Sequence, residues 1–179
     1  MIPIHNYLIV QASGESRNDI ISELTRACTQ CGCNILDAKI NILGQELAIT
    51  LFLSGNWGAI AKMEATFPSL EQKLGLTILA RRTREPAPIG QWMTYSVQIT
   101  AIDQLGILEG IVNFLTPLNV VIEEISANTY VNQTQTRMLN LELKINVSDK
   151  TQFASLREQF MSYCDEHNLD AFLEPFRGY

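Results

Sequence analysis

The sequence predicts an α+β protein made of two copies of one unit, each an antiparallel four-stranded sheet with two helices on one face. Three observations lead to this prediction: an apolar pattern that recurs after 87 residues, the same order of predicted elements in both copies, and a proline-containing segment between them. The chain has 179 residues, of which 46% are hydrophobic and 18% charged. That length suffices for two small domains with separate cores.

The repeat is clearest in the apolar positions of two predicted helices. The positions are Ile20, Ile21, Leu24, Ala27, Cys28 and Cys31 in the first helix and, 87 residues later, Ile107, Leu108, Ile111, Phe114, Leu115 and Leu118 in the second. Both sets follow the spacing i, i+1, i+4, i+7, i+8 and i+11, which places the side chains on one helical face. The same shift brings residues 7–10 close to 95–99 and residues 33–35 onto 120–122. Two copies of one unit explain these matches.

In the first copy, apolar periodicity and turn residues predict the order β-α-β-β-α-β. The elements are strand 6–12, helix 18–31, strand 34–42, strand 46–53, a helix that carries Trp57, Ile60, Ala61, Phe67 and Leu70, and strand 76–80. A turn at 43–45 joins the second and third strands, because glycine favours turns. Residues 54–56 are expected to cap the second helix.

The second copy repeats this order. Its elements are strand 94–101, helix 105–117, strands 120–130 and 136–147 joined by a polar loop at 132–134, a helix with Phe153, Leu156, Phe160, Tyr163 and Cys164 on one face, and strand 169–174. Such an order is the split βαβ, or ferredoxin-like, arrangement βαββαβ. We therefore expect domain 1 at residues 1–82, a linker at 83–92, where proline and glycine oppose regular structure, and domain 2 at 93–179.

The turn between the first strand and first helix of each copy carries the most information about function. In the second copy it reads Thr100-Ala101-Ile102-Asp103-Gln104-Leu105-Gly106-Ile107-Leu108. An Asp, a short spacer and Gly-Ile at the helix start resemble the ACT domain, a small-molecule-sensing module of amino-acid metabolism. The first copy has Gly14-Glu15-Ser16-Arg17-Asn18-Asp19-Ile20-Ile21 at this place, and its helix passes into Gly32-Cys33-Asn34-Ile35. Two such units in tandem resemble the glycine cleavage system transcriptional repressor family.

This resemblance implies a cytoplasmic, non-enzymatic regulator that responds to glycine and needs no cofactor. It further implies that the protein binds a DNA-binding transcriptional activator instead of DNA, and that it has no membrane partner. ACT modules usually pair, so a homodimer is an expectation, with the ligand near the strand-to-helix turns. An alternative that fits the same architecture is the regulatory subunit of an amino-acid-metabolising enzyme.

The candidate ligand-binding residues lie at the two strand-to-helix turns. They are Asp103, Gln104, Leu105, Gly106 and Ile107 in the second copy and Ser16, Arg17 and Asn18 in the first. A helix N-terminus attracts a carboxylate through its unpaired N–H groups, and a glycine lets a ligand approach the backbone. Asp103 would accept a hydrogen bond from the ammonium group of an amino acid. The alternative is that Asp103 is an ordinary N-cap of helix 105–117 and Gly106 eases packing.

The first copy departs from this pattern. Ser16 to Asp19 resembles a capping box, in which Asp19 reaches back to the cap. An acid at this position would repel a ligand carboxylate, an effect partly offset by Arg17. We therefore expect the second copy to bind the ligand and the first to be structural.

The two copies differ in net charge, and this difference bears on the kind of molecule that the protein binds. The formal net charge is −6, and from residue 93 onward five basic residues face eleven acidic ones, so the excess belongs to the second copy. An acidic chain repels nucleic acid and suits a basic protein partner, although a solubilising surface is the alternative explanation. The sequence contains no apolar stretch of the length needed to span a bilayer and no signal-peptide pattern at its start. We expect a cytoplasmic protein.

Catalytic and metal-binding patterns are weak. The chain has two histidines, His5 and His167, and no nucleophile or phosphate-loop motif. Cys28, Cys31 and Cys33 would form a metal site with Cys164 or His167 as the fourth ligand. Cys28 and Cys31 lie on the apolar face of a predicted helix, which favours small buried side chains instead. We therefore predict no metal site and no enzyme, and rank the regulator first.

Overall fold

A computed structural model describes residues 6–85, 92–149 and 151–176. The chain divides into two compact units, residues Met1–Ala87 (unit 1) and Pro88–Tyr179 (unit 2). None of the helices within the described ranges is long and apolar enough to cross a membrane.

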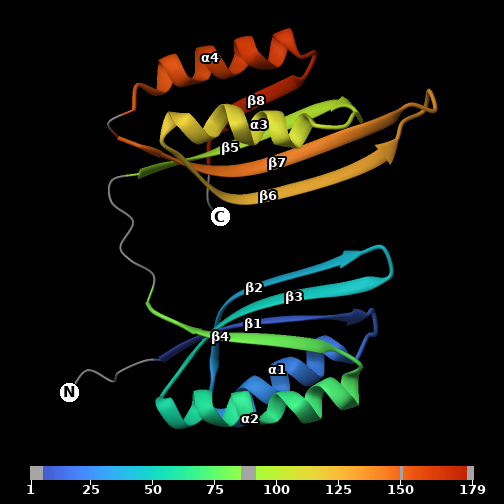
Figure 1. Cartoon of the computed structure of the whole chain (residues 1–179), viewed down its shortest axis with the longest axis vertical. Helices are drawn as coiled ribbons and strands as arrows, with labels where there is room; N and C mark the ends of the chain where they lie inside the picture. Colours follow the sequence, from blue (N-terminus) through green and yellow to red (C-terminus); the bar gives the residue numbers. More distant parts are fainter. Residues whose placement is uncertain (1–5, 86–91, 150, 177–179) are drawn as a thin grey trace. The chain divides into compact units, whose positions relative to one another are not determined.

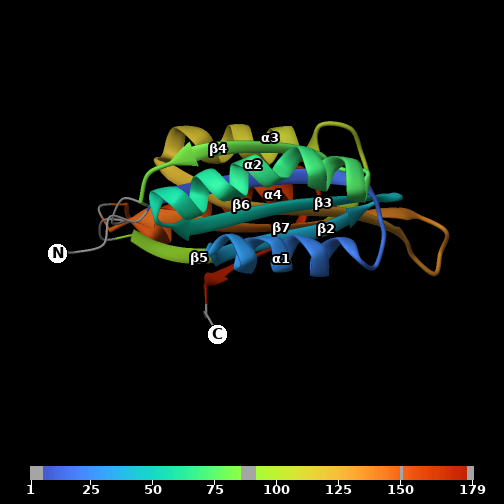
Figure 2. The ribbon, with the colours of Figure 1, turned by 90° about the horizontal axis from the view of Figure 1, so that it is seen from below.

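Unit 1 is a four-stranded antiparallel sheet with two helices on one face (Figure 1). Its elements are β1 (Asn6–Glu15), α1 (Ile20–Cys31), β2 (Asn34–Leu43), β3 (Glu46–Gly55), α2 (Trp57–Leu74) and β4 (Thr77–Thr83). The strand order is β2-β3-β1-β4. In the view from below, α1 and α2 lie side by side in front of these strands (Figure 2).

Unit 2 has the same topology, with strand order β6-β7-β5-β8. Its elements are β5 (Trp92–Ile102), α3 (Ile107–Leu115), the short 3₁₀ helix η1 (Thr116–Leu118), β6 (Val120–Val131), β7 (Arg137–Ser148), α4 (Phe153–Glu166) and β8 (Asp170–Pro175). The predicted α+β class and the tandem ferredoxin-like arrangement are confirmed.

Irregular features recur at the same 87-residue shift as the apolar pattern. The pairing register of β2 changes between Ile35 and Asp37, and that of β6 changes between Ile122 and Glu124. Gly32, two residues before β2, and Asn119, directly before β6, have left-handed φ angles of 80° and 55°. The two units therefore share backbone detail as well as the order of their elements.

Each unit has its own hydrophobic core between sheet and helices. On β1, the alternate residues Leu8, Val10 and Ala12 are buried, and on β5 so are Val97 and Ile99. This alternation follows from the period of two in a strand, which directs every second side chain to the helix layer. Among the described residues of each unit, both helices lie on one face of the sheet and none covers the other face (Figure 1).

Most predicted boundaries agree with the structure to within two residues. The exceptions are the ends of β1 and β4, which lie three residues later than predicted, at Glu15 and Thr83. Two helices begin two residues later than predicted. Helix α1 begins at Ile20 instead of residue 18, and α3 at Ile107 instead of residue 105. In both cases the preceding residues form the turn from the strand. The predicted cap of α2 is confirmed, because the Asn56 side chain accepts a hydrogen bond from the Ala59 N–H at 2.8 Å. In the predicted linker, Thr83 belongs to β4 and Trp92 to β5, and residues 86–91 lie outside the described ranges.

Candidate ligand-binding site

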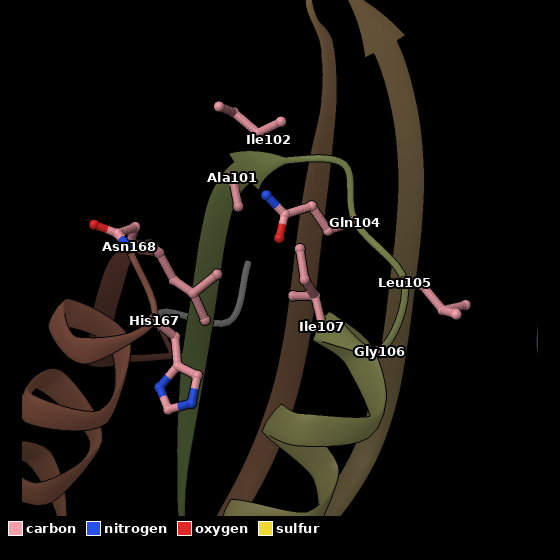
Figure 3. A pocket seen from close by; sticks show the side chains of 9 residues that line it. Ala101, Ile102, Gln104, Leu105, Gly106, Ile107, His167 and Asn168 are labelled. Atoms are coloured by element: carbon pink, nitrogen blue, oxygen red, sulfur yellow. The ribbon is translucent and has the colours of Figure 1, made fainter.

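The topology of unit 2 brings two turns together. Strands β5 and β8 are antiparallel neighbours, and Thr100 near the end of β5 pairs with Asp170 at the start of β8. The β5–α3 turn and the α4–β8 turn therefore lie side by side. Between them is a cavity of about 290 Å³, hereafter the inter-turn cavity (Figure 3). It is lined by Ala101, Ile102, Gln104, Leu105, Gly106, Ile107, His167, Asn168 and Leu169.

A wider and more open hollow of about 660 Å³ lies along the same turn. Its lining adds residues of α3 and of the neighbouring strands to the turn: Asp103, Gln104, Leu105, Gly106, Ile107, Leu108, Glu109, Ala127, Leu139 and Leu141. All five predicted residues of the second copy thus line at least one cavity. Residues 104–107 line both cavities, whereas Asp103 lines only the wider hollow.

The start of α3 differs from the predicted cap. Gly106, with φ of 91°, is the N-cap residue, and within the described part of the chain no side chain caps the helix. Asp103 lies earlier in the turn, where its backbone N–H donates to the Arg137 carbonyl at 3.0 Å. The interpretation of Asp103 as the N-cap is therefore wrong. The reason is that Gly106 takes a left-handed conformation and turns the chain into the helix there, which places the N-cap three residues later than predicted.

Side chains from both turns face the inter-turn cavity. Gln104 points from the β5–α3 turn toward Ala101, whereas Leu105 points away into solvent (Figure 3). On the opposite wall, the His167 ring stacks on Tyr163 with 4.2 Å between ring centroids, and His167 Nδ1 lies 2.7 Å from the Tyr163 carbonyl oxygen. That contact orients Nδ1 toward the helix.

In unit 1, the corresponding turn between β1 and α1 holds an ion pair formed by its own side chains. Arg17 Nε and Nη2 bond to the two carboxylate oxygens of Asp19 at 3.1 and 2.5 Å, and Arg17 Nη1 lies 3.4 Å from the Leu74 carbonyl oxygen. The hydrogen bond from Arg17 lowers the pKa of Asp19. The Ser16 backbone N–H donates to the Gln45 carbonyl at 3.0 Å, and Asn18 is exposed.

The capping box predicted for residues 16–19 is wrong. Asp19 is itself the N-cap residue of α1, and its side chain makes no capping hydrogen bond. Its carboxylate bonds to Arg17 because a charge-assisted pair with two parallel bonds is stronger than a bond to a neutral N–H group.

The α4–β8 turn was absent from the predicted site. Its residues His167, Asn168 and Leu169 line the inter-turn cavity although they lie more than sixty positions from Gly106 in the chain. The predicted βαββαβ order contains the signal needed to find them, because in this topology the first and last strands are antiparallel neighbours. The start of the last strand then lies beside the end of the first.

The four cysteines are all free thiols with buried side chains. Burial raises the pKa of Cys28 to about 11, and likewise that of Cys164. A metal ligand must be a thiolate, which these environments disfavour. Across residues 6–85, 92–149 and 151–176, no three or more His, Cys, Asp or Glu side chains are grouped so that they could hold a metal ion.

Comparisons with known proteins connect this architecture to one group of regulators. Residues 6–80, nearly all of the described part of unit 1, match the family model of the ACT domain. The chain is 29% identical over 168 residues to the glycine cleavage system transcriptional repressor of Escherichia coli K12, an alignment that covers 91% of this chain and 86% of that protein. The relative of the same name from Shigella flexneri matches to the same extent.

Two solved structures are similar to this chain over nearly its full length, across both units. A crystal structure assigned to a glycine cleavage system transcriptional repressor has a TM-score of 0.74 and 25% identity, with 98% of this chain and 99% of that chain covered. A protein of Galdieria sulphuraria has the same TM-score at 18% identity, with 97% and 99% covered, and supports the fold alone. Residues 6–80 thus match the ACT-domain model, and the whole chain is similar in sequence and fold to the glycine cleavage system transcriptional repressors.

Proposed function

We propose that this protein is an amino-acid-responsive regulator, with glycine the favoured ligand, that represses glycine cleavage genes by binding a DNA-binding activator protein. The observation that carries the proposal is the pair of cavities at the β5–α3 turn, in a chain similar to proteins named as repressors of the glycine cleavage system. The role requires no catalysis and goes with a cytoplasmic location.

The β5–α3 turn has the chemistry that a small amino acid needs. The first-turn N–H groups of α3 lack a side-chain cap among the described residues and favour a carboxylate, and Gly106 leaves the backbone open to close approach. Gln104 offers an amide oxygen to an ammonium group, and Ile107 supplies apolar lining. In the wider hollow, Asp103 offers a carboxylate for the same purpose.

A protein partner fits the charge of this chain better than DNA does. The acidic excess of the second copy repels a phosphate backbone and attracts a basic protein surface. In the basic cluster at residues 81–84, Arg82 is already paired with Glu64, at 2.9 and 2.6 Å. In the part of the chain that the structure describes, the edge strands β2 and β6 each pair with one strand only, so pairing between copies of the chain is part of the proposal.

Calorimetric titration of the purified chain with glycine, serine, alanine and the branched-chain amino acids tests the ligand. We expect saturable glycine binding that Gly106→Asp weakens by about tenfold or more, because an acid at the start of α3 repels the carboxylate. Gly44→Asp is the matched control: Gly44 also has a positive φ, and a Cβ at either glycine would meet nothing within 4 Å. Absence of binding by every amino acid tried, or equal weakening by both variants, would contradict the proposal.

The partner is tested by what co-purifies with the tagged chain from its own host. Recovery of a DNA-binding activator, in an amount that changes with added glycine, supports the proposal. Recovery of the catalytic subunit of a metabolic enzyme would favour the regulatory-subunit alternative. Tight binding of the chain alone to duplex DNA, measured by fluorescence anisotropy, would contradict the proposal that the protein acts through a protein partner.

A further inference from the structure

The inter-turn cavity lies between helix ends of opposite polarity. Helix α3 begins directly after Gly106, and α4 ends directly before His167, and both residues line the cavity. The first turn of a helix exposes N–H groups and partial positive charge, whereas the last turn carries partial negative charge. In α4 the Tyr163, Cys164 and Asp165 carbonyls also accept hydrogen bonds from the N–H groups of residues 167–169. A cavity with these two ends complements a ligand that carries both charges better than a simple anion or cation.

Unit 1 shows a cation and an anion at the equivalent helix ends. Under the 87-residue repeat, Arg17 corresponds to Gln104 and Asp19 to Gly106. The Arg17 guanidinium approaches the carbonyl of Leu74, the last residue of α2, and the Asp19 carboxylate lies at the start of α1. A hydrogen-bonded pair of opposite charges thus spans the two helix ends in unit 1. In unit 2 both positions are uncharged, and Gly106 has no side chain at all.

The backbone also closes the turns of unit 1 and separates those of unit 2. A Cβ on Gly14 would lie 2.6 Å from the Gly75 carbonyl oxygen, so β1 and the α2–β4 turn are in direct contact there. The counterpart of Gly14 is Ala101, whose side chain lines the inter-turn cavity. The connection from α4 to β8 contains one residue more than the connection from α2 to β4, and its Asn168 has a left-handed φ of 54°.

We propose that the inter-turn cavity binds the amino acid as a zwitterion, with its carboxylate at the start of α3 and its ammonium group at the end of α4. The Arg17–Asp19 pair takes the place of that ligand in unit 1, so each chain binds one molecule. Gln104 lies between the two ends and accepts a hydrogen bond from the ammonium group. This inference rests on the proposed amino-acid binding and selects the inter-turn cavity over the wider hollow.

The test uses the wild-type chain and fragments of the ligand. Calorimetry is run with glycine, with acetate, which lacks the ammonium group, and with glycinamide, which lacks the carboxylate. We expect one glycine per chain and at least about tenfold weaker binding of either fragment. Equal affinity for glycine and acetate would overturn the zwitterion assignment while leaving amino-acid binding intact, and two glycines per chain would overturn the role of the Arg17–Asp19 pair. Failure of glycine, serine and alanine alike would overturn the proposed function and this inference together.

Two variants locate the ligand. Gln104→Arg places a guanidinium where Arg17 stands in unit 1, and we expect it to reduce glycine binding at least about tenfold. Gln98→Arg is the control and should bind as wild type, because Gln98 lies on the outer face of β5 and lines a different hollow. Asp103→Ala separates the two cavities, because Asp103 lines the wider hollow but not the inter-turn cavity. Loss of binding in Asp103→Ala with retention in Gln104→Arg would place the ligand in the wider hollow and overturn the inference.

Discussion

Asp19 and Gly106 show how equivalent backbone positions acquire different chemistry. Both are N-cap residues 87 positions apart, but φ is −84° at Asp19 and 91° at Gly106. The hydrogen bond from Arg17 lowers the pKa of Asp19, whose carboxylate is therefore charged down to a lower pH than usual. Gly106 contributes only backbone. At this scale the copies differ in the charge at the helix start, although the fold around it is the same.

Residue burial makes a separate prediction for the cysteines. With its pKa raised to about 11 by burial, Cys28 is almost entirely a thiol at pH 8, with roughly one molecule in a thousand ionised. We expect none of the four cysteines to react quickly with a thiol-specific chromogenic reagent in the native protein, and all four to react in denaturant. A single thiol that reacts rapidly and stoichiometrically without denaturant would show that its site is more open than the structure indicates.

Among the elements, α2 and β4 of unit 1 are joined by a surface contact. Arg82 on β4 makes two hydrogen bonds to Glu64 on α2, and its guanidinium lies 5.9 Å from the centre of the Trp57 ring. The bond from Arg82 lowers the pKa of Glu64. Because the contact is largely solvent-exposed, it makes a small contribution to stability, but that contribution depends on pH.

The sign of the pH dependence follows from the lowered pKa. The contribution of Glu64 is complete above the ordinary glutamate pKa near 4.5 and is lost as the pH falls through the lowered value in the folded state. We expect the urea midpoint of unit 1 to fall less between pH 7 and pH 3.5 in Glu64→Gln than in the wild-type chain. Trp57 fluorescence in a Trp92→Phe background reports this midpoint. Glu46→Gln, at the exposed start of β3, is the control and should keep the wild-type dependence.

For the whole molecule, the main feature is two hydrophobic cores, each formed by residues of one unit. Leu24 lies in the core of unit 1 and Phe160 in that of unit 2, and both are essentially inaccessible to solvent. Each core is large enough to make its unit a cooperative element of stability. A defect in one core should therefore be felt mainly in that unit.

Matched cavity variants test this organisation. We expect Phe160→Ala to destabilise unit 2 by about 3–5 kcal/mol and Leu24→Ala to destabilise unit 1 by about 2–5 kcal/mol, because each leaves a cavity in a packed core. Hydrogen exchange should accelerate in β7 for the first variant and in β3 for the second. Equal acceleration in both strands by either variant would show that the units unfold as one.

Much of this architecture is readable from the amino-acid pattern. The 87-residue repeat, the βαββαβ order and the buried faces of β1 and β5 follow from apolar periodicity, which depends on neighbours a few residues apart. The Asn56 cap is also a local matter. Of the cavity lining, the turn at 104–107 could be proposed because glycine at a helix start is a local signal.

The rest depends on contacts between residues far apart in the chain. His167 and Asn168 meet the β5–α3 turn only because β5 and β8 pair, and Arg17 reaches Leu74 across 57 positions. A contact between distant residues also bears on the N-cap, which is Gly106 and not Asp103. The Asp103 N–H donates a hydrogen bond to the Arg137 carbonyl on β7 and so holds Asp103 in the turn before the helix. Local sequence determines which backbone conformations are low in free energy. The pairing of distant strands selects among these conformations and brings the two walls of the inter-turn cavity together.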